Sequence, residues 1–170
     1  MHLPSRNRVV PIDADVSLAF APRLVIAVWR GHVTMPHVLA LGREIRSFLP
    51  SCRNQGYGQI TVIEPGISMR MPDDVRATSE TMQREFAPHI KCMAYLVTQE
   101  GFVAAAARTV ASGFALVTRA PYPLKVIATP HETAGWVSRY TDLSVAEIEH
   151  LLGEVRASRP AGPTTTPPPR

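Results

Sequence analysis

Short runs of apolar residues, separated by glycine, proline and polar residues, recur along the chain and predict β-strands. Residues 24–29 and 92–97 are apolar throughout, which is typical of strands that are buried on both faces of a sheet. Residues 16–20 alternate instead, and they lie too close to residues 24–29 for a crossover connection, so we expect these two strands to pair as an antiparallel hairpin. The predicted strands are residues 16–20, 24–29, 60–63, 92–97 and 124–128.

Between these strands, apolar residues recur every three or four positions and predict amphipathic helices. Residues that cap helix N-termini precede most of them: Thr34 before the first, and Asp73 or Asp74 before the second. Two Ser/Thr-x-x-Glu capping boxes mark the last two helix starts. The predicted helices begin near Thr34, near Asp73, at Phe102, at Pro130 after the box Thr129–Glu132, and after Ser144 in the box Ser144–Glu147.

The order of the elements is β-β-α-β-α-β-α-β-α-α. This order predicts an α/β fold, with a mixed, mainly parallel sheet of about five strands, an N-terminal antiparallel hairpin strand and covering helices. We expect residues 1–15 to form an N-terminal arm and residues 16–157 to form a single domain. Residues 158–170 are rich in proline and threonine, which predicts a disordered tail.

Composition and charge narrow the classes of partner and compartment. The net charge is +4, but the arginines are scattered and do not gather with aromatic residues, so we expect no nucleic-acid partner. No apolar run is long enough to span a bilayer. Two cysteines are too few for a disulfide framework, so the cytoplasm is the expected location. We expect Cys92 to be buried in its strand and Cys52 to lie at the surface.

Motifs that would indicate an enzyme or a metal site are missing from the sequence. It contains neither a Gly-x-Gly-x-x-Gly loop nor a Gly-x-Ser-x-Gly elbow. His89 and Cys92 form a His-x-x-Cys, but no second pair supplies four ligands at zinc spacing, so we expect no metal and no cofactor. Glu64, at a strand end, is a candidate general base if it is buried; the alternative is that it caps a helix or pairs with Arg70.

The loop from Pro65 to Pro72 is the strongest candidate for a recognition site. It is longer than the usual strand-to-helix connection, and the carboxyl ends of parallel strands gather ligands and partners. Methionine adapts its shape to a partner and arginine anchors it, so this loop and the end of the next strand predict a partner-binding surface. The predicted partner-binding residues are Ile67, Met69, Arg70, Met71, Thr98 and Gln99.

Two segments resemble the STAS superfamily, the sulfate transporter and anti-sigma factor antagonist domains. The first is Val28-Trp29-Arg30-Gly31-His32-Val33-Thr34, which is similar to the turn before that family's first helix. The second is Pro123-Leu124-Lys125-Val126-Ile127 followed by Thr129, Glu132, Ala134 and Trp136, which is similar to the family's closing segment. The resemblance covers residues 16–140 and implies a STAS-like fold.

The resemblance also implies a regulatory phosphorylation site. Anti-sigma antagonists carry Asp-Ser-Ser-Gly in the loop after the corresponding strand, and its serine is phosphorylated. This chain has Glu64-Pro65-Gly66-Ile67-Ser68-Met69-Arg70 there, so the phosphoserine motif is not matched. Ser68 is the candidate phosphorylation site, and an ordinary exposed loop serine is the alternative.

Three functions remain open from the sequence. The first is a non-enzymatic regulatory or protein-interaction module with an unknown protein partner. The second is a domain that binds a small apolar ligand or lipid, as some relatives of the superfamily do. The third is an enzyme with a site around Glu64, Ser68, Arg70, Thr98 and Gln99. A homodimer is compatible with each of them.

The composition of the C-terminal segment leads to a test. Residues 160–170 contain five prolines and no large apolar side chain, so they have little to bury against a core. A chain truncated after Arg159 should keep its melting temperature within about 1–2 °C, because removing surface segments costs little stability. Calorimetry of both chains checks this, and a larger drop would show that the segment docks on the domain.

Overall fold

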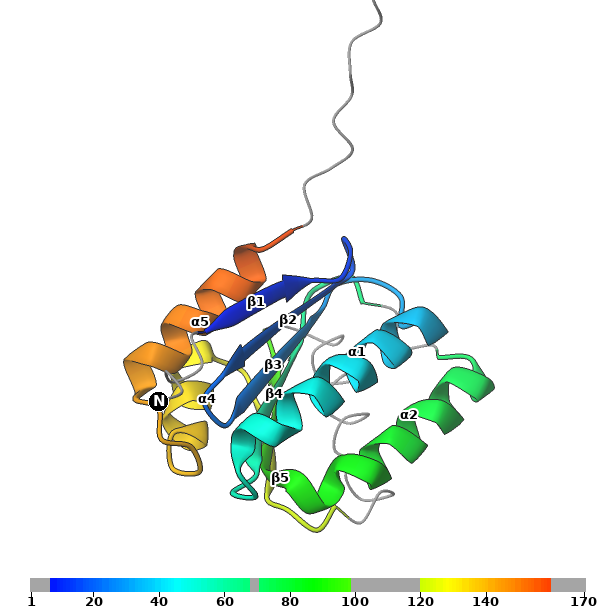
Figure 1. The fold of residues 1–170 in the computed structure, drawn as a ribbon. Coiled ribbons are helices and arrows are strands. Elements are labelled where there is room, and N and C mark those ends of the chain that lie inside the picture. Colours follow the sequence, from blue (N-terminus) through cyan, green and yellow to red (C-terminus); the bar gives the residue numbers. More distant parts are fainter. Residues whose placement is uncertain (1–6, 68–70, 99–119, 160–170) are drawn as a thin grey trace, which may run out of the picture.

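The computed structural model describes residues 7–67, 71–98 and 120–159, and these form one mixed sheet with helices on both faces (Figure 1). The strands are adjacent in the order in which they occur in the sequence. β2 pairs with β3 antiparallel, and β3 to β6 run parallel to one another. The mixed, mainly parallel sheet with an antiparallel hairpin strand is therefore confirmed. The strands are β1 (Arg8–Pro11), β2 (Val16–Ala21), β3 (Leu24–Trp29), β4 (Tyr57–Ile63), β5 (Ile90–Val97) and β6 (Leu124–Ile127).

The first strand, β1, lies in the segment that we expected to be an arm, and for these residues the expectation is wrong. β1 pairs antiparallel with β2, from Arg8 opposite Phe20 to Pro11 opposite Ser17. Arg8 also lies 4.6 Å above the Phe20 ring and 3.1 Å from the carboxylate of Glu44. A four-residue strand in a segment that contains two prolines has too weak a local pattern to be predicted from the sequence. The contacts with β2, Phe20 and Glu44 stabilise it instead.

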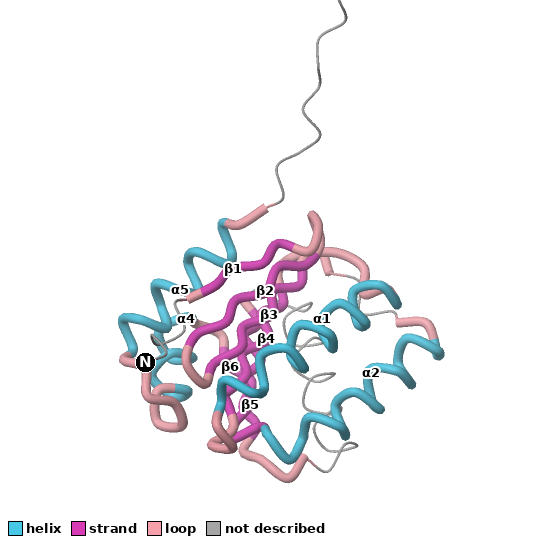
Figure 2. Tube along the Cα trace, viewed as in Figure 1, coloured by secondary structure: helices cyan, strands magenta, loops and turns pink. Residues whose placement is uncertain are grey.

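Helices cover the sheet on both faces (Figure 2). α1 (Met35–Phe48) and α2 (Asp73–Phe86) lie on one face, and α4 (Pro130–Val137) and α5 (Val145–Ala157) lie on the other. Single 3₁₀ turns, η1 (Leu49–Cys52) and η2 (Ala87–His89), follow α1 and α2. The helix predicted from Phe102 lies outside the described residues. No helix in the described ranges has the length and apolar character needed to cross a membrane.

Strand β3 shows why the sequence produces this layered fold. Its alternate side chains pack against opposite layers: Val25 and Ala27 lie in the core under α1, while Leu24 and Ile26 lie in the core under α4 and α5. All four side chains are fully buried. A strand with two buried faces needs a continuous apolar sequence, as observed here.

The predicted helix starts are largely confirmed. Thr34 is the N-cap of α1, and the Ser144–Glu147 capping box opens α5. Thr129 accepts a hydrogen bond from the backbone N–H of Glu132, but the Glu132 side chain reaches Lys125, 3.1 Å away, instead of closing the box. At α2 the N-cap is Pro72, so Asp73 and Asp74 fall in the first turn of the helix. Their negative charges interact favourably there with the positive end of the helix dipole.

A carboxylate–histidine pair fastens the turn between β1 and β2 to the first turn of α1. The Asp13 Oδ2 lies 2.5 Å from the His37 Nε2, and Asp13 Oδ1 accepts hydrogen bonds from the backbone N–H groups of Asp15 and Val16. Burial raises the pKa of Asp13, but the hydrogen bonds from His37, Asp15 and Val16 outweigh it and leave that pKa below its ordinary value. His37 itself is buried, with its ring edge-on to Trp29.

This pair predicts a stability that depends on acid pH. A lowered pKa in the folded state means that Asp13 stabilises the fold above its unfolded pKa of about 3.9, and that this contribution is lost as the pH falls through the folded value. Asp13→Asn should lower the free energy of unfolding by about 1 kcal/mol near pH 5, because the pair is partly exposed to solvent.

Denaturant unfolding from about pH 5 down to about pH 2.5 measures this difference. The gap between the two proteins should close at the acid end of that range. Glu80→Gln, at a carboxylate in the middle of α2, is the control. A gap that stays constant over the range would contradict the role given to the Asp13–His37 pair.

Candidate functional site

The carboxyl ends of the parallel strands lie side by side at one edge of the sheet. The register pairs Trp29 with Ile63 and Ile63 with Val97, so three strands end at the same level. The loops after β4 and β5 therefore leave the sheet together, as the sequence predicted. The residues that follow β3, β4 and β5 are Arg30, Glu64 and Thr98.

Glu64 forms an ion pair with an arginine far away in the sequence. Arg156, in the last turn of α5, donates from Nε to Glu64 Oε1 at 2.5 Å and from Nη2 to Oε2 at 3.0 Å. The two side chains are 32% and 16% exposed, respectively. The hydrogen bond with Glu64 raises the pKa of Arg156, against the effect of burial. Arg70, the partner considered from the sequence, lies outside the described residues.

Arg30 holds the C-terminal end of α5 against the sheet through hydrogen bonds. Its Nη1 donates to Ser17 Oγ at 2.9 Å, and its Nη2 lies 3.0–3.2 Å from the backbone carbonyl oxygens of Val155, Arg156 and Ser158. The last carbonyl groups of a helix have no partner within the helix, and a guanidinium supplies one. Ser158, which we assigned to the C-terminal tail, is thus part of the domain.

These residues line an open polar cleft of about 610 Å³, which we call the arginine cleft. Its charged side chains come from the β1–β2 turn, from the ends of β3 and β4, and from α5. They are Asp15, Arg30, Glu64, Arg156 and Arg159. Arg30 and Glu64 lie at the end of the sheet where the sequence placed a candidate site, whereas the other three come from segments in which we predicted none.

The predicted partner-binding residues divide into described and undescribed ones. Ile67 is half-buried and packs against the core under α1 and α2. Met71 is half-buried, with its sulfur 3.9 Å from Ser79 Oγ. Thr98 is half-buried, and its buried Oγ1 has no hydrogen-bond partner among the described residues. Ser68, Met69, Arg70 and Gln99 lie outside the described residues.

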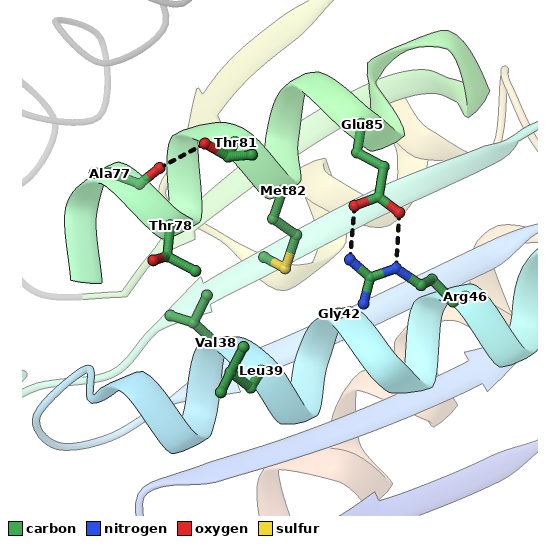
Figure 3. Close-up of a pocket in the computed structure, with 9 residues that line it drawn as sticks. All are labelled: Val38, Leu39, Gly42, Arg46, Ala77, Thr78, Thr81, Met82 and Glu85. Carbon is green, nitrogen blue, oxygen red and sulfur yellow. Dashed lines mark hydrogen bonds and ion pairs between the residues drawn. The ribbon is translucent and has the colours of Figure 1, made fainter. Parts of the chain in front are cut away.

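A second opening is a groove of about 300 Å³ between α1 and α2, which we call the helix groove (Figure 3). Val38 and Leu39 of α1 face Met82 of α2 across it, as Figure 3 shows. At one end, Arg46 and Glu85 form two hydrogen bonds of 2.7 and 2.6 Å.

Leu39, on the α1 wall of the helix groove, is 56% exposed and is the one large apolar side chain exposed in the described part of the protein. The sequence pattern did not indicate Leu39, because this residue lies beside the apolar stripe of α1 and not in it. A large apolar residue outside the buried stripe of a helix is the sequence signal that could have indicated an exposed apolar position here.

Both cysteines are buried, and burial raises the pKa of each thiol. Cys92 is buried in β5 as predicted, and burial raises its pKa to about 12. Cys52 is also buried, so its predicted surface position is wrong: η1 turns it into the core beside α1. Burial raises the pKa of the Cys52 thiol as well. Within the described ranges, no three His, Cys, Asp or Glu side chains are grouped so that they could hold a metal ion.

Comparison with known proteins addresses the fold. No family model matches the chain, and no curated protein matches it significantly. A crystal structure from Shewanella loihica, of an uncharacterized DUF3478-family protein with a SpoIIAA-like fold, superposes with a TM-score of 0.50. The match is 11% identical in sequence and covers 81% of this chain and 99% of the other. The chain has the SpoIIAA-like fold.

This is the fold of the STAS-like superfamily, so the resemblance found in the sequence is confirmed at the level of the fold. At this identity the likeness concerns architecture alone. The loop between β4 and α2 lacks the phosphoserine motif of the anti-sigma antagonists. Ser68 remains a predicted phosphorylation site.

The Glu64–Arg156 pair leads to a prediction about stability. In a double-mutant cycle with Glu64→Gln and Arg156→Gln, the two side chains should couple by about 1–2 kcal/mol, because the pair is bidentate and largely shielded from water. The exposed Arg46–Glu85 pair has the same bidentate geometry and is the control, and it should couple more weakly. Equal coupling in the two cycles would contradict the role of burial at Glu64.

Proposed function

We propose that this protein is a non-enzymatic regulatory module that binds another protein through the helix groove and the adjoining loop from Pro65 to Pro72. The observation that carries the proposal is the exposure of Leu39 in a groove whose other apolar lining comes from two helices. Apolar patches with a polar rim mark interaction sites, and Leu39 continues the apolar lining that α1 and α2 give to this groove.

The predicted recognition loop precedes α2, one of the two helices that line the helix groove. The loop leads directly into α2, and Ala77 and Thr78, which line the groove, lie about one turn after the start of that helix. On the other wall, Val38 and Leu39 lie in the first turns of α1. Both helices begin near the carboxyl ends of the strands, so we expect a partner seated in the groove to lie close to the described ends of the loop, residues 65–67 and 71–72.

The energetics suit a partner that contributes an apolar side chain. Full burial of a leucine contributes about 1.5–3 kcal/mol, so covering the exposed half of Leu39 contributes roughly 1 kcal/mol. Val38, Met82 and Ala77 extend the apolar floor, and Met82 adapts its shape to what it contacts. The Arg46–Glu85 pair gives the groove a polar rim, which is the usual arrangement at a protein interface.

The engagement of the polar side chains supports a non-enzymatic role. At the strand ends, Glu64 is bound by Arg156, and Arg30 is bound to the end of α5. Asp13 and His37 hold a turn to α1. Each of these groups joins two elements of the fold, which is a structural use of its charge. Binding of a small apolar ligand remains the alternative from the sequence, and the helix expected to bound such a cavity lies outside the described residues.

A charge placed in the helix groove tests the proposal. Leu39→Asp should abolish partner binding and leave the free energy of unfolding within about 0.5 kcal/mol, because the residue is exposed in the free protein. Ala146→Asp, at an exposed position of α5 on the opposite face of the sheet, is the matched control. Proteins that co-purify from the source cells with the wild type and with Ala146→Asp, but not with Leu39→Asp, are the expected partners.

The identified partner is then titrated with each purified protein. We expect at least a tenfold weaker affinity for Leu39→Asp and an unchanged affinity for Ala146→Asp. Equal binding by all three would overturn the proposal. If the species lost is a second copy of this chain, detected by sedimentation, the groove serves self-association and the proposed recognition of another protein is wrong.

A further inference from the structure

The arginine cleft is a second surface, separate from the helix groove, and its charges are unbalanced. Among the described residues, it gathers the guanidinium groups of Arg30, Arg156 and Arg159 and the carboxylates of Asp15 and Glu64, so in this part of the chain three positive charges face two negative ones. Its volume of about 610 Å³ lies within the range of about 300–1,000 Å³ that is usual for small-molecule sites. It also lies at the carboxyl ends of parallel strands, where open α/β sheets bind ligands.

The hydrogen bonds of the cleft show which donors remain for a ligand. A guanidinium carries five N–H donors. Arg156 uses Nε and Nη2 for Glu64, and among the described residues its Nη1 has no hydrogen-bond partner. Both terminal nitrogens of Arg30 already donate hydrogen bonds, one to Ser17 and the other to the end of α5. Arg159 has no carboxylate within ion-pair distance in the described part of the chain.

The like charges also act on one another. Burial lowers the pKa of Arg30, and the charges of Arg159 and Arg156 lower it further, against the smaller opposing effect of Glu64 and Asp15. Positive charges that are held together in this way are relieved by an anion between them. Because Arg30 and Arg156 are fixed by the fold, these two guanidinium groups are in place before a ligand arrives, which reduces the entropy cost of binding.

We propose that the arginine cleft binds the oxyanion group of a small molecule, a phosphate or a carboxylate, between Arg159 and the Nη1 side of Arg156. Arginine suits this role because its planar fork matches the geometry of both groups. Asp15 lies in the same cleft and repels the anion. Its carboxylate packs against Gly31, where an added methyl group would overlap it. The cleft is a different opening from the helix groove, and among the described residues it meets the proposed partner surface only at Pro65, the first residue of the recognition loop. Binding of a small anion does not require the protein partner.

Titration calorimetry of the full-length protein with inorganic phosphate, and separately with succinate, tests the site at constant ionic strength set by sodium chloride. We expect saturable binding of at least one of the two anions, and the one that binds assigns the class. Arg159→Gln should weaken it about fivefold or more, which is the loss of a charge-assisted hydrogen bond. Arg139→Gln, at an exposed arginine after α4, is the control and should change nothing.

A charge change of the opposite sign makes the test sharper. Asp15→Asn keeps the shape of the side chain and removes its negative charge, so it should tighten anion binding, whereas Arg159→Gln weakens it. Melting temperatures of the variants show that the fold is kept. No saturable binding of either anion, or equal affinities for the wild type and Arg159→Gln, would overturn the proposal, and so would weaker binding by Asp15→Asn.

Discussion

Burial of the central strands on both faces is the constraint on which the rest of this structure depends. β3 alternates its side chains between two cores, with Val25 under α1 and Ile26 under α4 and α5, and neither is exposed to solvent. Such a strand is stable only when helices cover both faces of the sheet. The chain must therefore place helices on each side, and the faces of the central strands are closed to ligands and partners.

The polar chemistry of the protein is displaced to the strand ends and to the outer helix surfaces. At the strand ends, Arg30 and Arg156 hold the last turn of α5 against the sheet, and the same two arginines define the arginine cleft. On the other side, α2 packs beside α1 and buries only Val75 and Phe86. One wall of the helix groove is therefore α2, which buries fewer side chains than α1. A wall with few buried contacts is the arrangement expected of a surface that meets partners.

The sequence was sufficient for the parts of this structure that local patterns encode. The apolar run of β3 and the capping box at Ser144 placed elements correctly, and the strand order gave the sheet. The ion pair that shapes the cleft could not be predicted from the sequence, because Glu64 and Arg156 are far apart in the chain and each is an ordinary charged residue by itself. The same holds for Asp13 and His37. The errors at β1 and Cys52 arose where contacts with distant residues outweigh a polar or proline-containing local composition.

Native-state hydrogen exchange of the free protein tests the constraint most directly. If both faces of the central strands are sealed, the amides of β3 and β4 should exchange only through global unfolding, with protection equal to the free energy of unfolding. The amides of α2 should exchange through a smaller opening, because few of its side chains are buried. Exchange of β3 and β4 at a free energy as low as that of α2 would contradict this account, because one layer of helices would then leave the sheet without unfolding it.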